Sequence, residues 1–305
     1  MKDTSFREYR ELGEITWLRD FEVGQGEAKT SGKPIVLLFQ EVPGCSTCVN
    51  FGQDVLSHPL LVELIEECFV PVAIFNNRPG KDAVVLRAFS EPAWNNPVVY
   101  LLDAEGTPIV PKLSNRYDPL GLHDRLVGAL VAKGKEIPPY AQLLRNDLMI
   151  ENGLAQQAIY ETPCFWSGET TLAGFNAVLS TEAGWIGGEE VVRVNFDPAL
   201  ADAEALDRFA MGEGFRRSKG RSFRTDDAPQ YYLSKSRLAE LPISLSQRTR
   251  INLAIPYKDA PEQFLSPRQR RWLERQQKGW LGNSKLYKQD FRQAWASFTD
   301  KPSPG

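Results

Sequence analysis

Residues 33–51 read KPIVLLFQEVPGCSTCVNF, and this stretch carries the strongest structural signal in the chain. Its first eight residues, 33–40, form a short, almost continuous apolar run, which is typical of a buried strand. A Pro-Gly turn follows, and Cys45 and Cys48 then open a segment whose apolar residues have helical spacing. The sequence predicts a strand, a turn and a helix that begins at a C-x-x-C motif.

A C-x-x-C motif at a helix start favours thiol chemistry. The helix N-terminus stabilises a thiolate on Cys45, which makes this cysteine the nucleophile. Cys48 follows one turn later on the same face, where it can close a disulfide. The alternative is half of a zinc site, but zinc needs four ligands, and the remaining soft donors, Cys68, Cys164 and two histidines, form no second paired motif. We therefore predict a thiol–disulfide pair and no metal.

Length, charge and composition limit the classes of protein. A length of 305 residues indicates two domains. With 42% hydrophobic and 25% charged residues, the composition is that of a globular protein. A net charge of −3 gives no reason to expect nucleic acid or a membrane surface as partner. We find no apolar stretch that could span a bilayer and no secretory signal at the polar N-terminus, so we expect a cytoplasmic protein. With two histidines in the chain, the chemistry must depend on Cys, Glu, Asp and Tyr.

Strand and helix signals alternate over the first half of the chain. We predict a helix over 49–67 with a kink at Pro59, a strand over 69–77, a helix over 82–90, two strands joined by a turn over 97–111, and a helix over 119–134. This order resembles the thioredoxin fold, with a mixed sheet, over roughly 15–135. Pro97 falls where that family keeps a cis-proline opposite the cysteines, whereas Gly44 stands where most thioredoxins have Trp before the first cysteine.

The second half of the chain has a different pattern. We predict a strand over 153–163 that leads into Cys164, a helix over 165–180, two strands over 180–198, a helix over 200–212 and a strand over 248–255. In the second strand of the pair, the apolar residues Val192, Val194 and Phe196 alternate with polar ones. The polar, proline-bearing stretch before this half reads as a linker. We therefore expect an α/β (α+β) protein with domains over 1–135 and 156–290, a linker over 136–155 and a C-terminal tail over 291–305.

Four separated patches in the second half share a resemblance. CFWSGE, residues 164–169, resembles the active-site motif of the A-type peptide methionine sulfoxide reductases, which carry Cys-Phe-Trp and a Glu five residues after the Cys. The order continues with STEAGWIGGEEVVRVNFDP at 180–198, TDDAPQYYLS at 225–234 and PEQFLSPRQRRWLERQ at 261–276. The resemblance implies an α/β domain that reduces a sulfoxide, most simply the S epimer of free or peptide-bound methionine sulfoxide.

The resemblance also implies roles for residues of the first patch. Cys164 would be the nucleophile that attacks the sulfoxide sulfur, and Phe165 and Trp166 would form the apolar pocket for the substrate methyl group. Glu169, in an apolar setting that raises its pKa, would protonate the departing oxygen.

The later patches supply the remaining candidates. Tyr231 aligns with the family's hydrogen-bonding tyrosine, although a shift of one residue would assign this role to Tyr232. Asp226 aligns with the family's acidic residue. Trp185 stands in the place of a second tyrosine, and its indole can donate one hydrogen bond but has no hydroxyl.

The two cysteine sites lead to one hypothesis for the whole chain. Attack by Cys164 would leave a sulfenic acid, and no cysteine follows it in the sequence. Cys45 would then attack the oxidised Cys164, Cys48 would resolve the mixed disulfide, and an external thioredoxin-type reductant or dithiol would restore the pair, with no other cofactor. Two alternatives remain open: a protein disulfide reductase whose second domain binds a partner, and a non-catalytic redox sensor.

Overall fold

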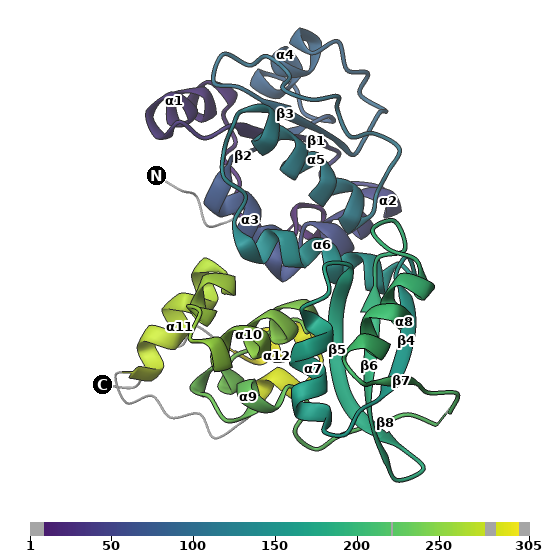
Figure 1. The fold of residues 1–305 in the computed structure, drawn as a ribbon. Helices are drawn as coiled ribbons and strands as arrows, with labels where there is room; N and C mark the ends of the chain where they lie inside the picture. The colour runs from purple at the N-terminus through teal and green to yellow at the C-terminus, as the bar shows by residue number, and fades with distance from the viewer. Residues whose placement is uncertain (1–8, 221, 278–284, 299–305) are drawn as a thin grey trace. The chain divides into compact units, whose positions relative to one another are not determined.

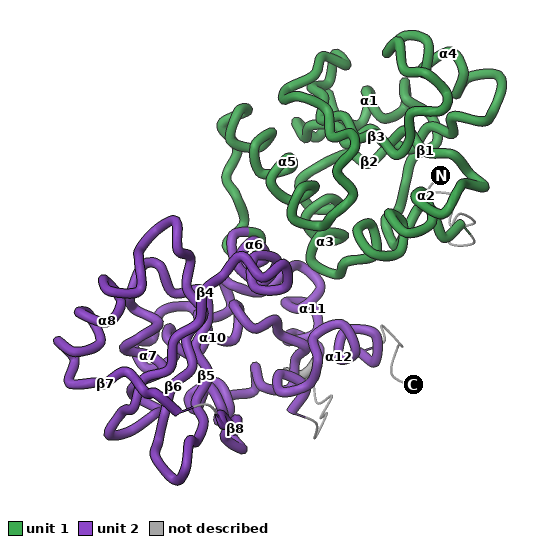
Figure 2. Tube along the Cα trace, turned by 90° about the vertical axis from the view of Figure 1, so that its right-hand side faces the viewer, with its two compact units in different colours: residues 1–141 green, residues 142–305 purple. Residues whose placement is uncertain are grey.

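The computed structural model describes residues 9–220, 222–277 and 285–298. The chain divides into two compact units, unit 1 over Met1–Ala141 and unit 2 over Gln142–Gly305, each with a sheet of its own (Figures 1 and 2). Among the described residues, none of the helices combines the length and the hydropathy that crossing a bilayer requires.

Unit 1 follows the alternation that the sequence predicts. Its elements are α1 (Phe21–Ser31), β1 (Ile35–Gln40), α2 (Ser46–Asn50), a π-helical turn (Phe51–Val55), α3 (Pro59–Cys68), β2 (Val70–Phe75), α4 (Lys81–Ala88), β3 (Val98–Leu102), α5 (Pro119–Ala132) and the first residues of α6 (Pro139–Glu151).

The sheet of unit 1 is mixed, with strand order β2-β1-β3. The central strand β1 pairs in parallel with β2 and antiparallel with β3, and all six of its residues are buried. Helices α1 and α4 pack on the face that carries Ile35, Leu37 and Phe39, through Ala28 and Leu86. Helices α3 and α5 cover the other side (Figure 1). Burial on both faces explains why β1 is apolar at nearly every position.

Three expectations for unit 1 need correction. The helix predicted over 49–67 is interrupted rather than kinked: α2 and the π-helical turn end at Val55, and Pro59 starts α3 at its first position, where the missing N–H costs nothing. Of the two strands predicted over 97–111, only β3 forms. The segment that returns after the turn pairs with β3 only at two isolated bridges, through Pro108 and Leu113. The predicted linker over 136–155 is largely α6, which begins at Pro139.

Unit 2 contains an antiparallel sheet with a layer of helices. Its elements after α6 are β4 (Gln156–Glu161), α7 (Phe165–Ala173), β5 (Val178–Ile186), β6 (Glu189–Phe196), α8 (Ala203–Gly212), β7 (Arg216–Arg217), β8 (Arg224–Thr225), α9 (Tyr231–Ser234), α10 (Leu245–Tyr257), α11 (Pro267–Gln277) and α12 (Phe291–Ser297).

The five strands of unit 2 lie in the order β7-β4-β6-β5-β8. One face is apolar: Val192, Val194 and Phe196 of β6 are fully buried against α7 and α8. The alternate positions Arg193 and Asn195 are half-buried on the other face. This period of two is the pattern that the sequence predicts for a sheet with one solvated face.

Three expectations for unit 2 are also wrong. The helix predicted over 165–180 ends at Ala173, and Val178 and Leu179 belong to β5. The stretch 248–255, predicted as a strand, lies within α10, whose N-terminus carries a capping box made by Ser244 and Gln247. The predicted tail over 291–305 contains α12, although 299–305 lie outside the described residues.

The C-terminal helices of unit 2 share a core of their own. Residues of α9, α10, α11 and α12 and of the turns between them bury their apolar side chains together, among them Leu233, Ile251, Trp272, Tyr287 and Phe298. This core supports the segment before α9, because the hydroxyl of Tyr287 donates a hydrogen bond to the carbonyl of Pro229 at 2.9 Å.

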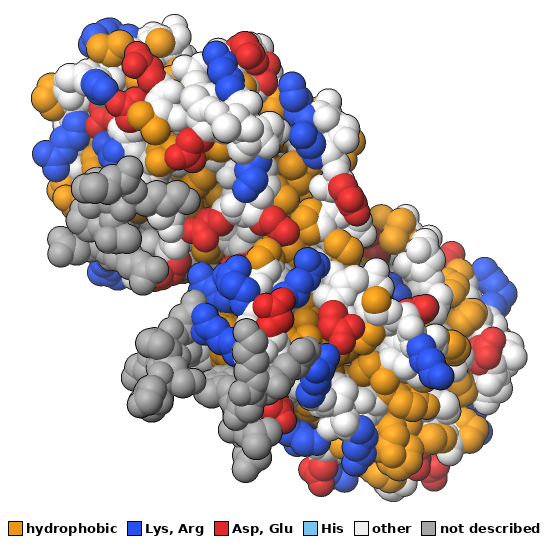
Figure 3. Space-filling model, turned by 90° about the vertical axis from the view of Figure 1, so that its left-hand side faces the viewer, with side chains coloured by type: hydrophobic (Ala, Val, Ile, Leu, Met, Phe, Trp, Pro, Cys, Tyr) orange, Lys and Arg blue, Asp and Glu red, His pale blue; other side chains and the backbone are white. Residues whose placement is uncertain are grey.

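Surface charge is mixed. On the face drawn in Figure 3, both signs of charged side chain are interspersed with apolar ones over the two units, in line with a net charge of −3.

Candidate active sites

The first candidate site is the pair Cys45 and Cys48 in unit 1. Cys45 is the residue before α2 and is exposed, whereas Cys48, within α2, is fully buried. The two sulfur atoms are 3.7 Å apart, so a small rotation of either side chain brings them to bonding distance. The arrangement has one sulfur that a partner can reach and a second sulfur directly behind it.

The surroundings of the pair distinguish the two thiols further. The backbone N–H of Cys48 lowers the pKa of Cys45, since it stabilises the thiolate. Burial raises the pKa of Cys48 to about 12. At neutral pH, Cys45 is therefore the better nucleophile and Cys48 remains a thiol.

Two loops complete the first site. A Cβ on Gly44 would lie 2.3 Å from the carbonyl oxygen of Glu41 and 2.7 Å from the Cβ of Cys48, so a tryptophan cannot occupy this position without a rearrangement. The Cys48 thiol donates a hydrogen bond to the side-chain oxygen of Asn96. The Asn96–Pro97 peptide is cis, as the sequence predicts for the segment opposite the cysteines.

The second candidate site surrounds Cys164 in unit 2. Cys164 is half-buried and is the last residue before α7, at the end of the turn that leaves β4. Its carbonyl oxygen accepts hydrogen bonds from the N–H of Gly168 and the hydroxyl of Ser167, which fix the first turn of the helix. The predicted position at a helix start is confirmed.

Aromatic side chains from three segments gather beside Cys164. Phe165 is buried and contacts Trp166 and Trp185 edge to face, with ring centroids 5.9 and 5.2 Å apart. Trp166 stacks on Tyr231 at 3.9 Å and remains 39% exposed. Tyr232 contacts only the edge of Tyr231 within this group. Between the two tyrosines, the geometry therefore favours Tyr231 as the site residue.

Asp226 holds the aromatic group from the side of β8. Its Oδ1 accepts the indole N–H of Trp185 at 2.9 Å, and its Oδ2 accepts the N–H of Ala228 at 2.8 Å. The single donor of Trp185 is therefore occupied within the protein. Asp226 orients this indole, while the flat face of Trp185 contributes to the aromatic group.

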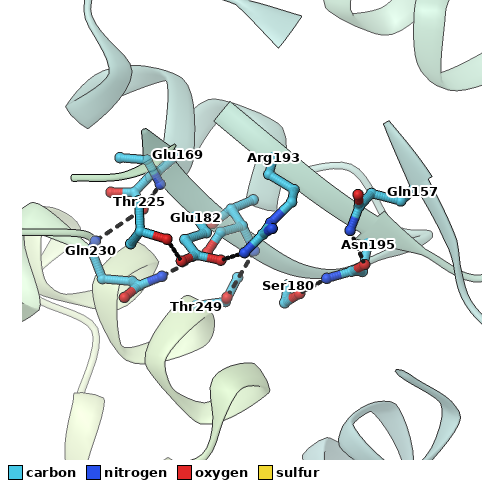
Figure 4. A network of polar contacts seen from close by, with 11 residues as sticks. Gln157, Glu169, Ser180, Glu182, Arg193, Asn195, Thr225, Gln230 and Thr249 are labelled. Carbon is cyan, nitrogen blue, oxygen red and sulfur yellow. Dashed lines mark hydrogen bonds and ion pairs between the residues drawn. The ribbon is translucent and has the colours of Figure 1, made fainter. Parts of the chain in front are cut away.

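Glu169 is buried, as the sequence predicts, and it also binds backbone groups. Its carboxylate is fully buried and accepts the backbone N–H groups of Ala183, Gln230 and Tyr231 at 2.8, 2.9 and 3.3 Å. Figure 4 shows Glu169 beside Gln230. Burial raises its pKa to about 8, as expected of a carboxyl group in an apolar setting. These contacts join α7, β5 and the start of α9, so Glu169 stabilises the packing of these elements.

Sequence reasoning missed Glu190. This residue of β6 accepts the backbone N–H of Phe165 at 2.8 Å, which places a carboxylate at the N-terminus of α7 directly beside Cys164. Such a contact satisfies one of the free donors at a helix start. Alternation along β6 puts Glu190 on the same face of the sheet as Val192 and Val194. This pattern could have predicted that the Glu190 side chain points toward the helices that cover that face.

The two units carry different kinds of cysteine site. In unit 1, a mixed sheet, a helix that starts at a C-x-x-C pair and a neighbouring cis-proline define a thioredoxin-like domain with a thiol–disulfide site. In unit 2, a cysteine at a helix start lies beside an aromatic group that is held by an aspartate.

Comparison with known proteins agrees with the first assignment. A family model described as Thioredoxin-like matches residues 16–104, so the thioredoxin-like domain predicted for the N-terminal half is confirmed. One similar solved structure is titled "DsbH Oxidoreductase"; the match has 16% identity and a TM-score of 0.34 and covers 43% of this chain and 92% of that one. No curated protein matches the chain. The matched family segment lies in unit 1, and the resemblance of unit 2 to the A-type reductases stays a prediction.

Proposed function

We propose that this protein is a thiol–disulfide oxidoreductase whose reducing pair serves a second thiol site at Cys164. The observation that carries the first part is the geometry of Cys45 and Cys48, with an exposed sulfur 3.7 Å from a buried one. The thioredoxin-like fold of the matched segment supports the same activity.

The exchange reaction follows from this asymmetry. The Cys45 thiolate attacks one sulfur of a substrate disulfide, and the other sulfur leaves as a thiolate that takes up a proton. Cys48 loses its proton and attacks Cys45, which releases the second substrate thiol and leaves the Cys45–Cys48 disulfide. The substrate gains two electrons and the pair loses two, and an external dithiol restores the pair.

Disulfide reduction with single-cysteine variants tests this part. We expect Cys45→Ser to abolish the reduction of a protein disulfide, whereas Cys48→Ser should accumulate a mixed disulfide that mass spectrometry detects. Cys68→Ser is the matched control, because burial raises the pKa of Cys68 to about 12 and its sulfur has no part in the pair. Full activity of Cys45→Ser would show that the pair is not the reducing site.

Reduction of a sulfoxide at Cys164 is the second candidate function. It is favoured by the aromatic group beside this cysteine, in which Trp166 stacks on Tyr231 and Asp226 orients Trp185. An exposed tryptophan face next to a thiol can hold the methyl group of a sulfoxide against the attacking sulfur. The same group would serve free or peptide-bound methionine sulfoxide.

The proposed step transfers an oxygen atom. The Cys164 thiolate attacks the sulfoxide sulfur, the oxygen passes to the cysteine, and the products are a thioether and a sulfenic acid on Cys164. The step needs a proton for the oxygen, which Glu169 would supply, because burial raises its pKa to about 8. Cys45, or an added dithiol, then attacks the sulfenic sulfur and releases water.

Turnover with dithiothreitol isolates this step from unit 1. We expect the S epimer of methionine sulfoxide, free or in a peptide, to be reduced by the wild type and not by Cys164→Ser. Trp166→Ala should raise KM more than it lowers kcat, because it removes the surface that holds the methyl group. If neither epimer is reduced, Cys164 does not have this activity, and the proposal for unit 1 remains.

The link between the sites needs a separate measurement. With a thioredoxin-type reductant in place of dithiothreitol, we expect Cys45→Ser to stop sulfoxide turnover while its activity with dithiothreitol persists. Equal loss with both reductants would argue against a relay. A redox sensor would instead consume one equivalent of peroxide, change its shape or oligomeric state, and show no turnover with either reductant.

A further inference from the structure

A carboxylate lies next to the cysteine pair. Among the described residues, the side chains of Glu41, Cys45 and Cys48 bring one oxygen and two sulfur donors within 4.8 Å of one another. Glu41 directly follows β1 and is half-buried, and the tight turn at Gly44 folds the loop back so that the carboxylate meets the cysteines. The spacing of C-x-x-C alone does not reveal this third donor, and the prediction of no metal from the sequence did not include it.

The spacing of the sulfur atoms fits a metal ion as well as it fits exchange chemistry. Two Zn–S bonds of about 2.3 Å at a tetrahedral angle place the sulfurs about 3.8 Å apart. The observed separation of the Cys45 and Cys48 sulfurs is 3.7 Å. The carboxylate oxygen lies within 4.8 Å of both sulfurs, close enough to serve as a third ligand to the same ion once it moves in to bonding distance.

We propose that Glu41 and the reduced pair Cys45 and Cys48 form a three-ligand site for Zn²⁺. Thiolates and a carboxylate form a donor set that this borderline-soft ion accepts, and three protein ligands leave its fourth position open. Because Cys45 is exposed, the open position faces solvent. On binding, the ion replaces the two thiol protons, and no electron is transferred.

A bound ion would set the state of the site. With both sulfurs coordinated, Cys45 is no longer free to attack a disulfide. The ion would therefore hold the pair in a reduced and unreactive form until a chelating ligand removes it. Binding of Zn²⁺ at this site is a property separate from thiol–disulfide exchange and does not depend on it.

Cobalt is the probe that tests the site most directly. The reduced protein, treated with a chelator and then freed of it, is titrated with Co²⁺, and the thiolate-to-cobalt absorption in the near ultraviolet is recorded. We expect one ion per chain and displacement of the cobalt by Zn²⁺. No thiolate-to-cobalt absorption in the wild type would overturn the proposal.

Variants assign the ligands. Glu41→Gln should weaken Zn²⁺ binding at least ~10-fold, because the loss even of a residue that only supports a ligand costs about 10–100-fold. Glu105→Gln, an exposed carboxylate on the turn after β3, is the matched control and should bind as the wild type does. Cys164→Ser should also keep the cobalt spectrum. Loss of the spectrum in Cys164→Ser, or unchanged affinity in Glu41→Gln, would contradict the assignment.

A labelling experiment supplies a second readout. Zn²⁺ at the lowest concentration that occupies the wild-type site should slow the alkylation of Cys45, and at the same concentration it should protect Glu41→Gln much less. A free-thiol count in chelator confirms that both proteins start with the same reduced cysteines. Equal protection of the two proteins would show that Glu41 is not a ligand.

Discussion

At the scale of single residues, Gly44 determines how closely the loop approaches the cysteine pair. The space where a Cβ would stand is occupied by the Glu41 carbonyl and by the Cβ and Sγ of Cys48, at 2.3, 2.7 and 3.2 Å. The sequence shows Gly44 only as a departure from the usual thioredoxin tryptophan. The structure supplies the physical reason, which depends on a contact across the turn that no local pattern records.

Gly44→Ala should therefore destabilise the protein. We expect a loss of about 1–3 kcal/mol in the free energy of unfolding, because either the Glu41 carbonyl or Cys48 must move. Urea unfolding measures the loss. Gly26→Ala in α1 is the matched control, since nothing lies within 4 Å of its added Cβ, and it should stabilise the helix by ~0.5–1 kcal/mol. Equal effects of the two substitutions would contradict the crowding at Gly44.

Cys45 should react with iodoacetamide at a lower pH than an ordinary cysteine. The first cause of its lowered pKa is the backbone N–H of Cys48, so Cys48→Ser should retain most of the effect. The rate of alkylation is followed against pH in chelator and in a Cys68→Ser, Cys164→Ser background. A midpoint that returns to the ordinary cysteine value in Cys48→Ser would assign the effect to the Cys48 side chain instead.

At the scale of elements, the sequence predicts best where a pattern is local and repeated. The apolar run of β1, the alternation in β6 and the helix start at Cys164 all appear as predicted. The stretch 248–255, predicted as a strand, contains branched residues, which favour strands. The capping box at Ser244 and burial of Ile251 among the C-terminal helices place it in α10 instead. Tertiary packing overrode propensity there.

Contacts between elements explain what the sequence could not show at the second site. Glu169 and Glu190 both contact the region around Cys164, but only Glu169 lies within the motif CFWSGE at 164–169. The backbone groups that Glu169 binds come from β5 and the start of α9, far along the chain. A pattern within one segment cannot predict such partners.

The contact between β6 and α7 yields a prediction of its own. Glu190→Ala removes the acceptor for the Phe165 N–H and should cost about 0.5–2 kcal/mol, as the loss of a helix cap does. Glu190→Gln retains an acceptor oxygen and should cost less. Thermal unfolding gives the order of stabilities. An alanine variant as stable as the wild type would mean that water replaces the carboxylate without loss.

At the scale of the whole molecule, two buried carboxyl groups of unit 2 link stability to pH. Burial raises the pKa of Glu169 from 4.5 to about 8 and that of Asp147 from 3.8 to about 6. Between the unfolded and folded pKa values, the folded state binds more protons than the unfolded state. The stabilising contribution is complete below the unfolded values and is lost as pH rises through the folded ones.

The stability of unit 2 should accordingly fall as the pH rises from about 4.5 to 8. Urea unfolding at several pH values, monitored by a signal from unit 2, measures this slope. Glu169→Gln cannot ionise and should flatten the slope above pH 6, where Asp147 has already lost most of its proton. An unchanged slope in this variant would show that Glu169 stays ionised in the folded protein.

Because Cys45 is exposed and Cys48 is buried behind it, the protein itself limits how long a mixed disulfide with a partner can last. Any partner captured by Cys45 is held next to a second sulfur that can expel it, so the time a partner stays attached is set inside the protein rather than by thiols in solution. The protein therefore sets the rate at which every partner is released. A substitution of Asn96, which accepts the hydrogen bond of the Cys48 thiol, should change the residence time of all partners together.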